Sequence, residues 1–82
     1  MRNVVLYSRP GCCLCDDARK IVERVRARRP FDLSEVDIDG DDALLRSYLE
    51  RIPVVTIDGV EAFELFVNEA ELEARLDMVH TA

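Results

Sequence analysis

The sequence predicts an α/β domain in which a strand–helix–strand unit is followed by a helix, two antiparallel strands and a last helix. A short apolar, β-prone run from Val4 to Tyr7 precedes a long stretch with helical periodicity. A second β-compatible stretch follows, and Asp58-Gly59 further on is a strong signal for a two-residue hairpin turn. The 82 residues are expected to form one domain, residues 1–82, because a chain of this length supports one modest core.

The first helix is expected to run from about Cys13 to Arg28, and Pro30 stops it because proline lacks the N–H donor that a helix interior needs. Its apolar residues with helical spacing are Leu14, Ala18, Ile21, Val22 and Val25. The second strand is expected between Phe31 and Ile38, which completes a parallel βαβ unit with a right-handed crossover. Its core candidates are Phe31, Leu33, Val36 and Ile38.

The middle of the chain predicts a short helix and a hairpin. Asp39-Gly40-Asp41 is a turn and N-cap signal. The helix that follows carries its apolar residues on one side, at Leu44, Leu45, Tyr48 and Leu49. Pro53 breaks this helix, and 54–57 is expected to be the third strand. The fourth strand is expected from Val60 to about Phe66.

The last part of the chain predicts strand cover and a capped helix. Phe63, Leu65 and Phe66 are expected to lie in the core or to cover the strand, with a partner groove as the alternative. Asn68 is expected to cap the last helix, with Glu71 in the capping-box position. The buried stripe of this helix is expected at Leu72, Leu76 and Val79.

The segment Cys12-Cys13-Leu14-Cys15 falls between the first strand and the first helix. Two cysteines spaced C-x-x-C at a helix N-terminus are typical of a redox dithiol. Unpaired N–H groups and the helix macrodipole stabilise an anion there, so Cys12 is expected to be the thiolate nucleophile. Cys15, one turn on, can resolve a mixed disulfide. Arg9 adds positive charge near Cys12, and Asp16 and Asp17 oppose it.

Composition and charge exclude several classes of partner. A formal net charge of −6 argues against nucleic acid or an anionic membrane. No stretch is as long as a membrane span, and because Asp16 and Asp17 come early with no apolar run of signal-peptide length before them, we expect no signal peptide. The three cysteines are clustered and cannot staple distant segments, so we expect a cytoplasmic, reducing location. We also expect a monomer without a cofactor. The arginines at the end of the first helix are expected to form a solvated face rather than a phosphate site; they are Arg24, Arg26, Arg28 and Arg29.

Two motifs resemble the glutaredoxin-like branch of the thioredoxin superfamily. One runs from Tyr7 through the cysteines to Ala18, and the other is Arg51-Ile52-Pro53-Val54-Val55. The resemblance covers nearly the whole chain and implies a thioredoxin fold, βαβαββα, with a four-stranded mixed sheet flanked by three helices. It also implies a redox-active disulfide between Cys12 and Cys15 and a cis Ile52–Pro53 bond beside it. In the family the residue before this proline offers its backbone to the substrate, and Arg9 aligns with a basic substrate-binding residue.

The chain departs from the family at the place where glutathione-using members bind the γ-glutamyl carboxylate. Those members carry a glycine pair before the last helix, whereas this chain has bulky residues at 63–67 followed by Asn68 and Glu69. Bulky side chains would prevent close backbone approach, and Glu69 and Glu71 would repel a carboxylate. We therefore expect glutathione to bind weakly, and a thioredoxin-reductase-type system or a protein thiol to be the reductant.

The residues favour a thiol–disulfide oxidoreductase that acts on protein or small-molecule disulfides. Two other classes stay open at this point. Cys12, Cys13 and Cys15 could form a metal or iron–sulfur module, although a metal usually needs a fourth ligand. His80, the single histidine, is near the C-terminus and is not expected to be a ligand. The third possibility is a non-catalytic interaction domain of thioredoxin type.

Overall fold

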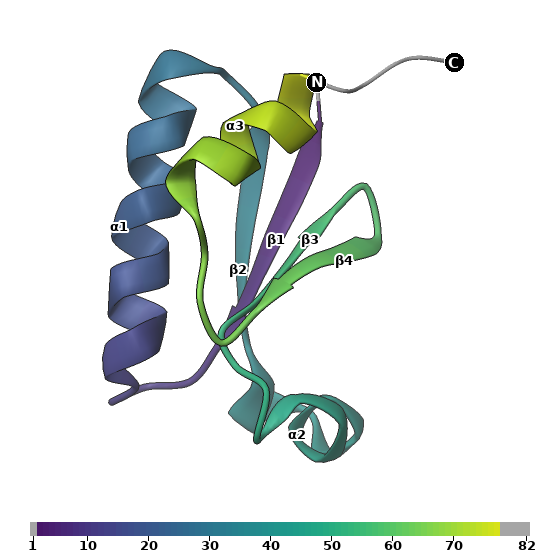
Figure 1. Ribbon diagram of the computed structural model, residues 1–82. Coiled ribbons are helices and arrows are strands. Elements are labelled where there is room, and N and C mark those ends of the chain that lie inside the picture. The colour runs from purple at the N-terminus through teal and green to yellow at the C-terminus, as the bar shows by residue number, and fades with distance from the viewer. Residues whose placement is uncertain (1, 78–82) are drawn as a thin grey trace.

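The chain folds into a four-stranded mixed sheet that carries two helices on one face and a short helix near one end (Figure 1). The fold is described from a computed structural model, which describes residues 2–77. Its elements are β1 (Asn3–Ser8), α1 (Cys13–Arg28), β2 (Asp32–Asp37), a 3₁₀ turn η1 (Ile38–Gly40), α2 (Asp42–Tyr48), β3 (Val54–Ile57), β4 (Val60–Glu64) and α3 (Glu69–Asp77). The predicted element order is confirmed for this part of the chain.

The strand order is β2-β1-β3-β4. β1 pairs in parallel with β2 and antiparallel with β3, and β3 pairs antiparallel with β4. The predicted βαβ unit and hairpin are therefore both present. At the hairpin turn Asp58 and Gly59 have φ angles of 53° and 87°, the left-handed values that a tight hairpin turn requires and that favour this residue pair.

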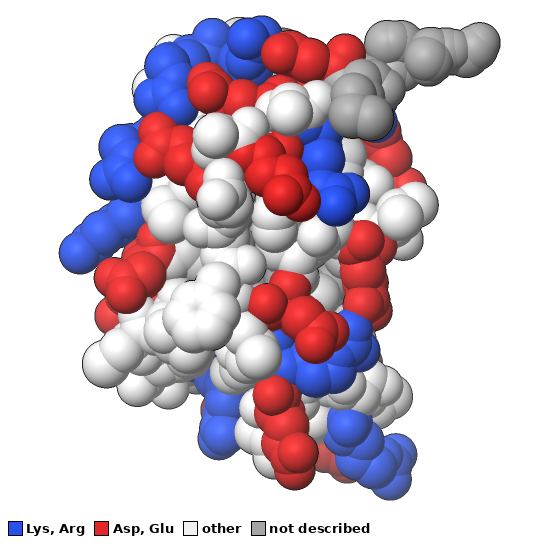
Figure 2. Space-filling view, in the orientation of Figure 1, with Lys and Arg blue, Asp and Glu red and all other residues white. Residues whose placement is uncertain are grey.

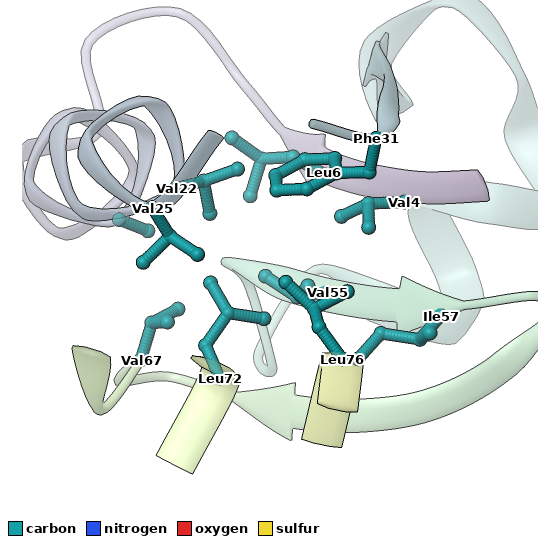
Figure 3. Close-up of a cluster of buried hydrophobic side chains, with 11 residues drawn as sticks. Val4, Leu6, Val22, Val25, Phe31, Val55, Ile57, Val67, Leu72 and Leu76 are labelled. Carbon is teal, nitrogen blue, oxygen red and sulfur yellow. The ribbon is translucent and has the colours of Figure 1, made fainter. Parts of the chain in front are cut away.

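The main core lies between one face of the sheet and the two longer helices (Figure 3). Val4 and Leu6 alternate with outward residues along β1, as a strand with one covered face requires. Val22 and Val25 of α1 meet them from one helix, and Leu72 from α3 reaches the same cluster. Leu76 is buried as predicted, whereas Val79 lies outside the described residues.

The opposite face of β1 is covered at its carboxyl end by α2. Tyr7, which points away from the main core, packs with Leu44 and Tyr48 against a second, smaller buried cluster. That cluster has Cys15 and Ile52 among its members. The dithiol region therefore has its own apolar support, separate from the main core.

Two strands are shorter than the sequence pattern predicts. β2 spans 32–37, and Phe31 and Ile38 are buried just outside it. β4 ends at Glu64 instead of continuing to Phe66, because Leu65 takes a left-handed conformation with φ of 69° that ends the extended backbone. Leu65 and Phe66 are 37% and 70% exposed, so the prediction that they belong to the core or the strand cover was wrong.

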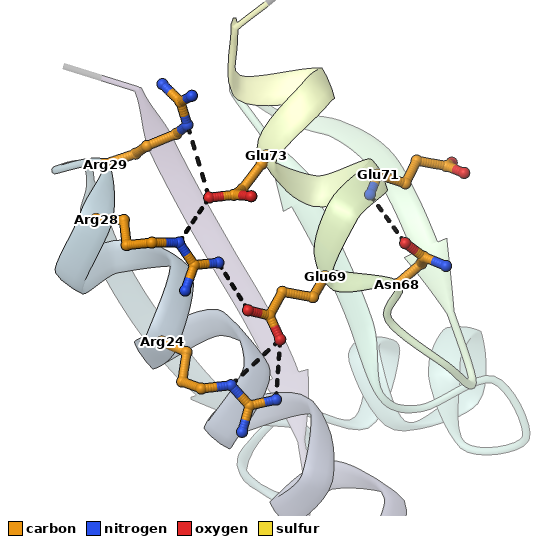
Figure 4. A network of polar contacts seen from close by, with 7 residues as sticks. All are labelled: Arg24, Arg28, Arg29, Asn68, Glu69, Glu71 and Glu73. Carbon is orange, nitrogen blue, oxygen red and sulfur yellow. Dashed lines mark hydrogen bonds and ion pairs between the residues drawn. The ribbon is translucent and has the colours of Figure 1, made fainter.

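α3 is fixed by its cap and by ion pairs to α1 (Figure 4). The Asn68 side chain accepts the Glu71 N–H at 2.9 Å, which confirms the predicted cap. Glu69 pairs with Arg24 and Arg28 of α1 at 2.9 and 2.7 Å. Arg24 and Arg28 lie at the surface as predicted, and they also join α1 to α3.

No helix within residues 2–77 combines the length and the apolar character that crossing a bilayer requires.

Candidate active site

A tight turn places Cys12 at the start of α1. Gly11 has φ of +79°, which suits glycine because it has no Cβ. Cys12 is the N-cap: its backbone is extended, and its sulfur accepts the backbone N–H of Cys15 at 3.2 Å. This N–H belongs to the first turn, whose donors have no partner inside the helix. The sulfur of Cys12 therefore lies where a helix stabilises negative charge.

The structure brings Cys12 and Cys15 together but gives their side chains different environments. Cys12 is half-buried, Cys13 is exposed and Cys15 is fully buried, and all are free thiols. Burial, and next its hydrogen bond to Cys12, raise the pKa of the Cys15 thiol to about 11. The Arg9 backbone and the Arg19 charge act weakly in the opposite direction. Of the two sulfurs that lie together, Cys12 is thus the accessible one, and Cys15 remains a protonated thiol in the interior.

Ile52 and Pro53 lie beside the dithiol. The peptide bond between them is cis, as the resemblance implies. Ile52 is buried in one cluster with Cys15, and Cys12 packs against that cluster. The backbone N–H of Ile52 donates to the carbonyl of Tyr48 at 3.0 Å. A substrate could use this N–H only if that bond were given up, which the sequence pattern did not indicate.

Arg9 is paired within the protein. Its guanidinium lies 3.0 Å from the carboxylate of Asp39, and the two side chains are 40% and 39% exposed. The charge expected to face a substrate is therefore partly neutralised by the turn that follows β2. Asp39 appeared in the sequence only as a turn residue, and nothing in its spacing from Arg9 indicated the contact.

The sequence also gave no sign of the aromatic and polar contacts around the dithiol. Tyr7 and Tyr48 stack with ring centroids 4.8 Å apart, and Arg51 lies 5.3 Å from the centre of the Tyr48 ring. On the β2 side of α1, the buried Ser8 hydroxyl donates to Glu35 at 2.9 Å. Arg19 pairs with the same carboxylate. Ser8, Arg19 and Glu35 line part of a hollow of about 310 Å³ next to the turn that carries Cys12.

Within residues 2–77 no group of three or more His, Cys, Asp or Glu side chains is arranged to hold a metal ion. Cys13 points to solvent while Cys15 points into the protein, so the three thiols do not converge as one ligand set.

The fold and the dithiol place the chain in a known class. Residues 3–77 match the family model described as "Glutaredoxin-like domain (DUF836)". The chain belongs to this glutaredoxin-like family of the thioredoxin superfamily. An uncharacterised protein of Mycobacterium tuberculosis is 30% identical over 88% of this chain and 79% of its own length. A glutaredoxin-like protein of Dictyostelium discoideum is 29% identical over 94% of this chain and 77% of its own.

Solved structures agree with this assignment. A protein of X. campestris superposes with a TM-score of 0.78 at 30% identity, over 94% of this chain and 99% of the other. A protein of Nitrosomonas europaea gives 0.78 at 29% identity, over 90% of this chain and 89% of the other. A thioredoxin of Halobacterium salinarum gives 0.73 at 17% identity, over 99% of this chain and 76% of the other. The thioredoxin fold expected from the sequence is therefore confirmed.

Proposed function

We propose that the protein is a dithiol oxidoreductase that reduces disulfides through Cys12 and Cys15. The observation that carries this proposal is the arrangement of Cys12 and Cys15. The sulfur of Cys12 lies accessible at the start of α1 and accepts the backbone N–H of Cys15, whose own thiol is buried. An accessible thiolate at a helix N-terminus is the nucleophile of thiol–disulfide exchange.

In the first step the Cys12 thiolate attacks one sulfur of a substrate disulfide. The substrate S–S bond breaks, a bond forms between Cys12 and one half of the substrate, and the other half leaves as a thiolate that takes up a proton. In the second step Cys15 loses its proton and attacks the Cys12 sulfur. The second half of the substrate leaves as a thiol, and the dithiol, having given two electrons, is now the Cys12–Cys15 disulfide. An external thiol then reduces it.

The test uses hydroxyethyl disulfide as substrate and measures exchange in three variants. Cys12→Ser should abolish exchange, because the nucleophile is gone. Cys15→Ser should accumulate a mixed disulfide on Cys12, visible by mass spectrometry. Cys13→Ser should keep most of the activity and is the control for loss of a nearby thiol. Equal loss in Cys13→Ser and Cys12→Ser would contradict the assigned roles and favour a site built from all three sulfurs.

Glutathione is proposed to be a poor reductant for this site. The Asn68 side chain already accepts the N–H of Glu71, so one donor at the start of α3 is occupied. Phe66 is exposed just before that helix, and Glu69 already engages the guanidinium groups of Arg24 and Arg28 that could otherwise attract a carboxylate. Loss of a charge-assisted carboxylate site lowers affinity by about tenfold to a hundredfold.

A glutathione-coupled assay beside an active glutaredoxin tests this, with thioredoxin plus thioredoxin reductase as the second arm. We expect slow turnover with glutathione and faster turnover with the thioredoxin system. Turnover with glutathione that matches the glutaredoxin would contradict the proposal.

We also propose a cytoplasmic location, because a dithiol that works in its reduced form requires a reducing compartment. Cell fractionation with an antibody against the protein tests this location.

A further inference from the structure

The residues that end β4 lie beside the dithiol rather than in the core. The N–H of Leu65 donates to the carbonyls of Pro53 and Arg51, at 2.9 and 3.1 Å. Ile52, between those two residues, is buried in one cluster with Cys15. Leu65 and the exposed Phe66 therefore stand at the rim of the site.

The first turn of α1 carries another exposed apolar side chain. Leu14 is 37% exposed, and Asp17, three residues on, shares its helical stripe. Arg24, two turns further along the same stripe, contacts Glu69 at the start of α3. This stripe of α1 thus faces the segment that leads from Phe66 into α3. Figure 2 shows uncharged surface over the start of α1 and over that segment, with acidic side chains at its margin.

We propose that Leu14, Leu65 and Phe66, here called the apolar rim, bind an apolar side chain next to the reactive cysteine of a polypeptide disulfide. Asp17 favours polypeptides that also carry a lysine or arginine near that cysteine. This inference rests on the proposed oxidoreductase function and names the substrate class for it.

Exposure and charge argue for this occupant. An aromatic ring that is 70% exposed gains stabilisation when a partner removes it from water, and large side chains give the most. A small hydrophilic disulfide cannot cover such a ring, whereas a polypeptide can. The formal net charge of −6 and the exposed carboxylate of Asp17 favour a cationic polypeptide over an acidic one.

The experiment compares pentapeptides that carry one cysteine as a mixed disulfide with mercaptoethanol. The residues next to the cysteine are leucine or serine, and the terminal residues are lysine or glutamate. Phe66→Ser is tested against Val60→Ser, because Val60 is equally exposed at 69% but lies at the far hairpin turn. Asp17→Asn is tested against Glu23→Gln, an exposed acid further along α1. Hydroxyethyl disulfide is the control substrate, because it is too small and too hydrophilic to cover the apolar rim.

We expect Phe66→Ser to lower kcat/KM for the leucine peptides about tenfold and to leave hydroxyethyl disulfide exchange unchanged. Val60→Ser should change neither. Asp17→Asn should lower the lysine-to-glutamate preference about twofold to threefold at low salt, with a smaller effect at high salt.

Equal losses on leucine and serine peptides, or equal effects of Phe66→Ser and Val60→Ser, would overturn the inference while the proposed function stands. A wild-type protein that sediments as a dimer and a Phe66→Ser protein that sediments as a monomer would show that a second copy covers the apolar rim, which also overturns it. If hydroxyethyl disulfide is not exchanged at all, the proposed function itself fails.

Discussion

Three cysteines that are near neighbours in the sequence occupy three different environments. The sulfur of Cys12 receives a backbone N–H at the start of α1, Cys13 points to solvent, and Cys15 is fully buried. The helix produces this difference, because residues one position apart differ in direction by about 100° while residues three apart return to neighbouring positions.

The reduced protein should be alkylated first at Cys12 and last at Cys15. Cys12 combines access with an N–H bond to its sulfur, whereas burial keeps the pKa of Cys15 at about 11. A limiting amount of iodoacetamide at about pH 7.5, a value below the usual thiol pKa, followed by peptide mass spectrometry, measures the order. In a Cys12→Ser background, Cys15 should react faster as the pH rises toward its pKa. First modification at Cys13 or Cys15 would mean that the nucleophile is assigned to the wrong residue.

Glu35 links β2 to α1 and should make stability depend on pH. Hydrogen bonds from Arg19, and to a smaller extent from Ser8, hold the pKa of this carboxyl below its usual range. Because the folded pKa is lower than the unfolded one, the stabilisation is present above about pH 4.3 and is lost as the pH falls through the folded pKa.

Glu35→Gln should therefore lower the free energy of unfolding by about 0.5–1 kcal/mol at neutral pH, a small value because the ion pair is partly exposed. The difference from the wild type should vanish in strong acid. Urea unfolding as a function of pH measures it, with Glu23→Gln, on the exposed side of α1, as the control. A stability difference between wild type and Glu35→Gln that grows as the pH falls would contradict the lowered pKa of Glu35 as its cause.

At the scale of the elements, ion pairs join the exposed sides of α1 and α3 next to the apolar core that both helices share. Glu69 contacts two arginines of α1, and Glu73 contacts Arg28 at 2.8 Å (Figure 4). Glu71 instead pairs with Arg75 on its own helix. Glu69 therefore reports on the docking of α3 against α1, whereas Glu71 reports on the stability of α3 itself.

Glu69→Gln should destabilise the protein more than Glu71→Gln, because Glu69 joins two elements and Glu71 pairs within one. The excess should shrink as salt is raised, since screening weakens exposed pairs. Thermal unfolding of both variants at low and high salt measures the difference. Equal effects at low salt would mean that the pairs in Figure 4 add nothing to helix docking.

Element order was predictable from the sequence, whereas the details around the site were not. Periodicity and turn residues identified the bounds of α1 and the position of the hairpin turn, because their signals are local. The end of β4 was not predictable, because a leucine gives no hint of a left-handed backbone. The pairing of Arg9 with Asp39 joins loops 30 residues apart in sequence, and no periodic pattern encodes such a contact.

The described part of the molecule has two apolar clusters, which stabilise different parts of the fold. The larger one, with Leu6 and Leu72, binds the sheet to α1 and α3. The smaller one contains Cys15 and is covered by α2, whose Leu44 packs against it. Loosening the smaller cluster should therefore change the reactivity of the site without unfolding the rest.

Leu72→Ala should lower the free energy of unfolding by about 2–5 kcal/mol, and Leu44→Ala by only about 1 kcal/mol. Their effects on the buried thiol should be reversed. In a Cys12→Ser background, Leu44→Ala should speed native-state alkylation of Cys15 more than Leu72→Ala does. Urea unfolding and alkylation rates measured on the same samples compare the two. The same rank order in both measurements would mean that the clusters unfold as one unit.

Leu65 has a backbone conformation that is unfavourable for its residue type. A left-handed backbone costs a leucine about 1 kcal/mol or more, and glycine would adopt it freely. The leucine has φ of 69° and is 37% exposed, and its N–H donates to the carbonyls of Arg51 and Pro53, so partial burial and these hydrogen bonds offset part of that cost. If the apolar rim binds substrate as we propose, the leucine at position 65 gives up some folding stability for a side chain that the substrate contacts, and Leu65→Gly should stabilise the fold while weakening peptide binding.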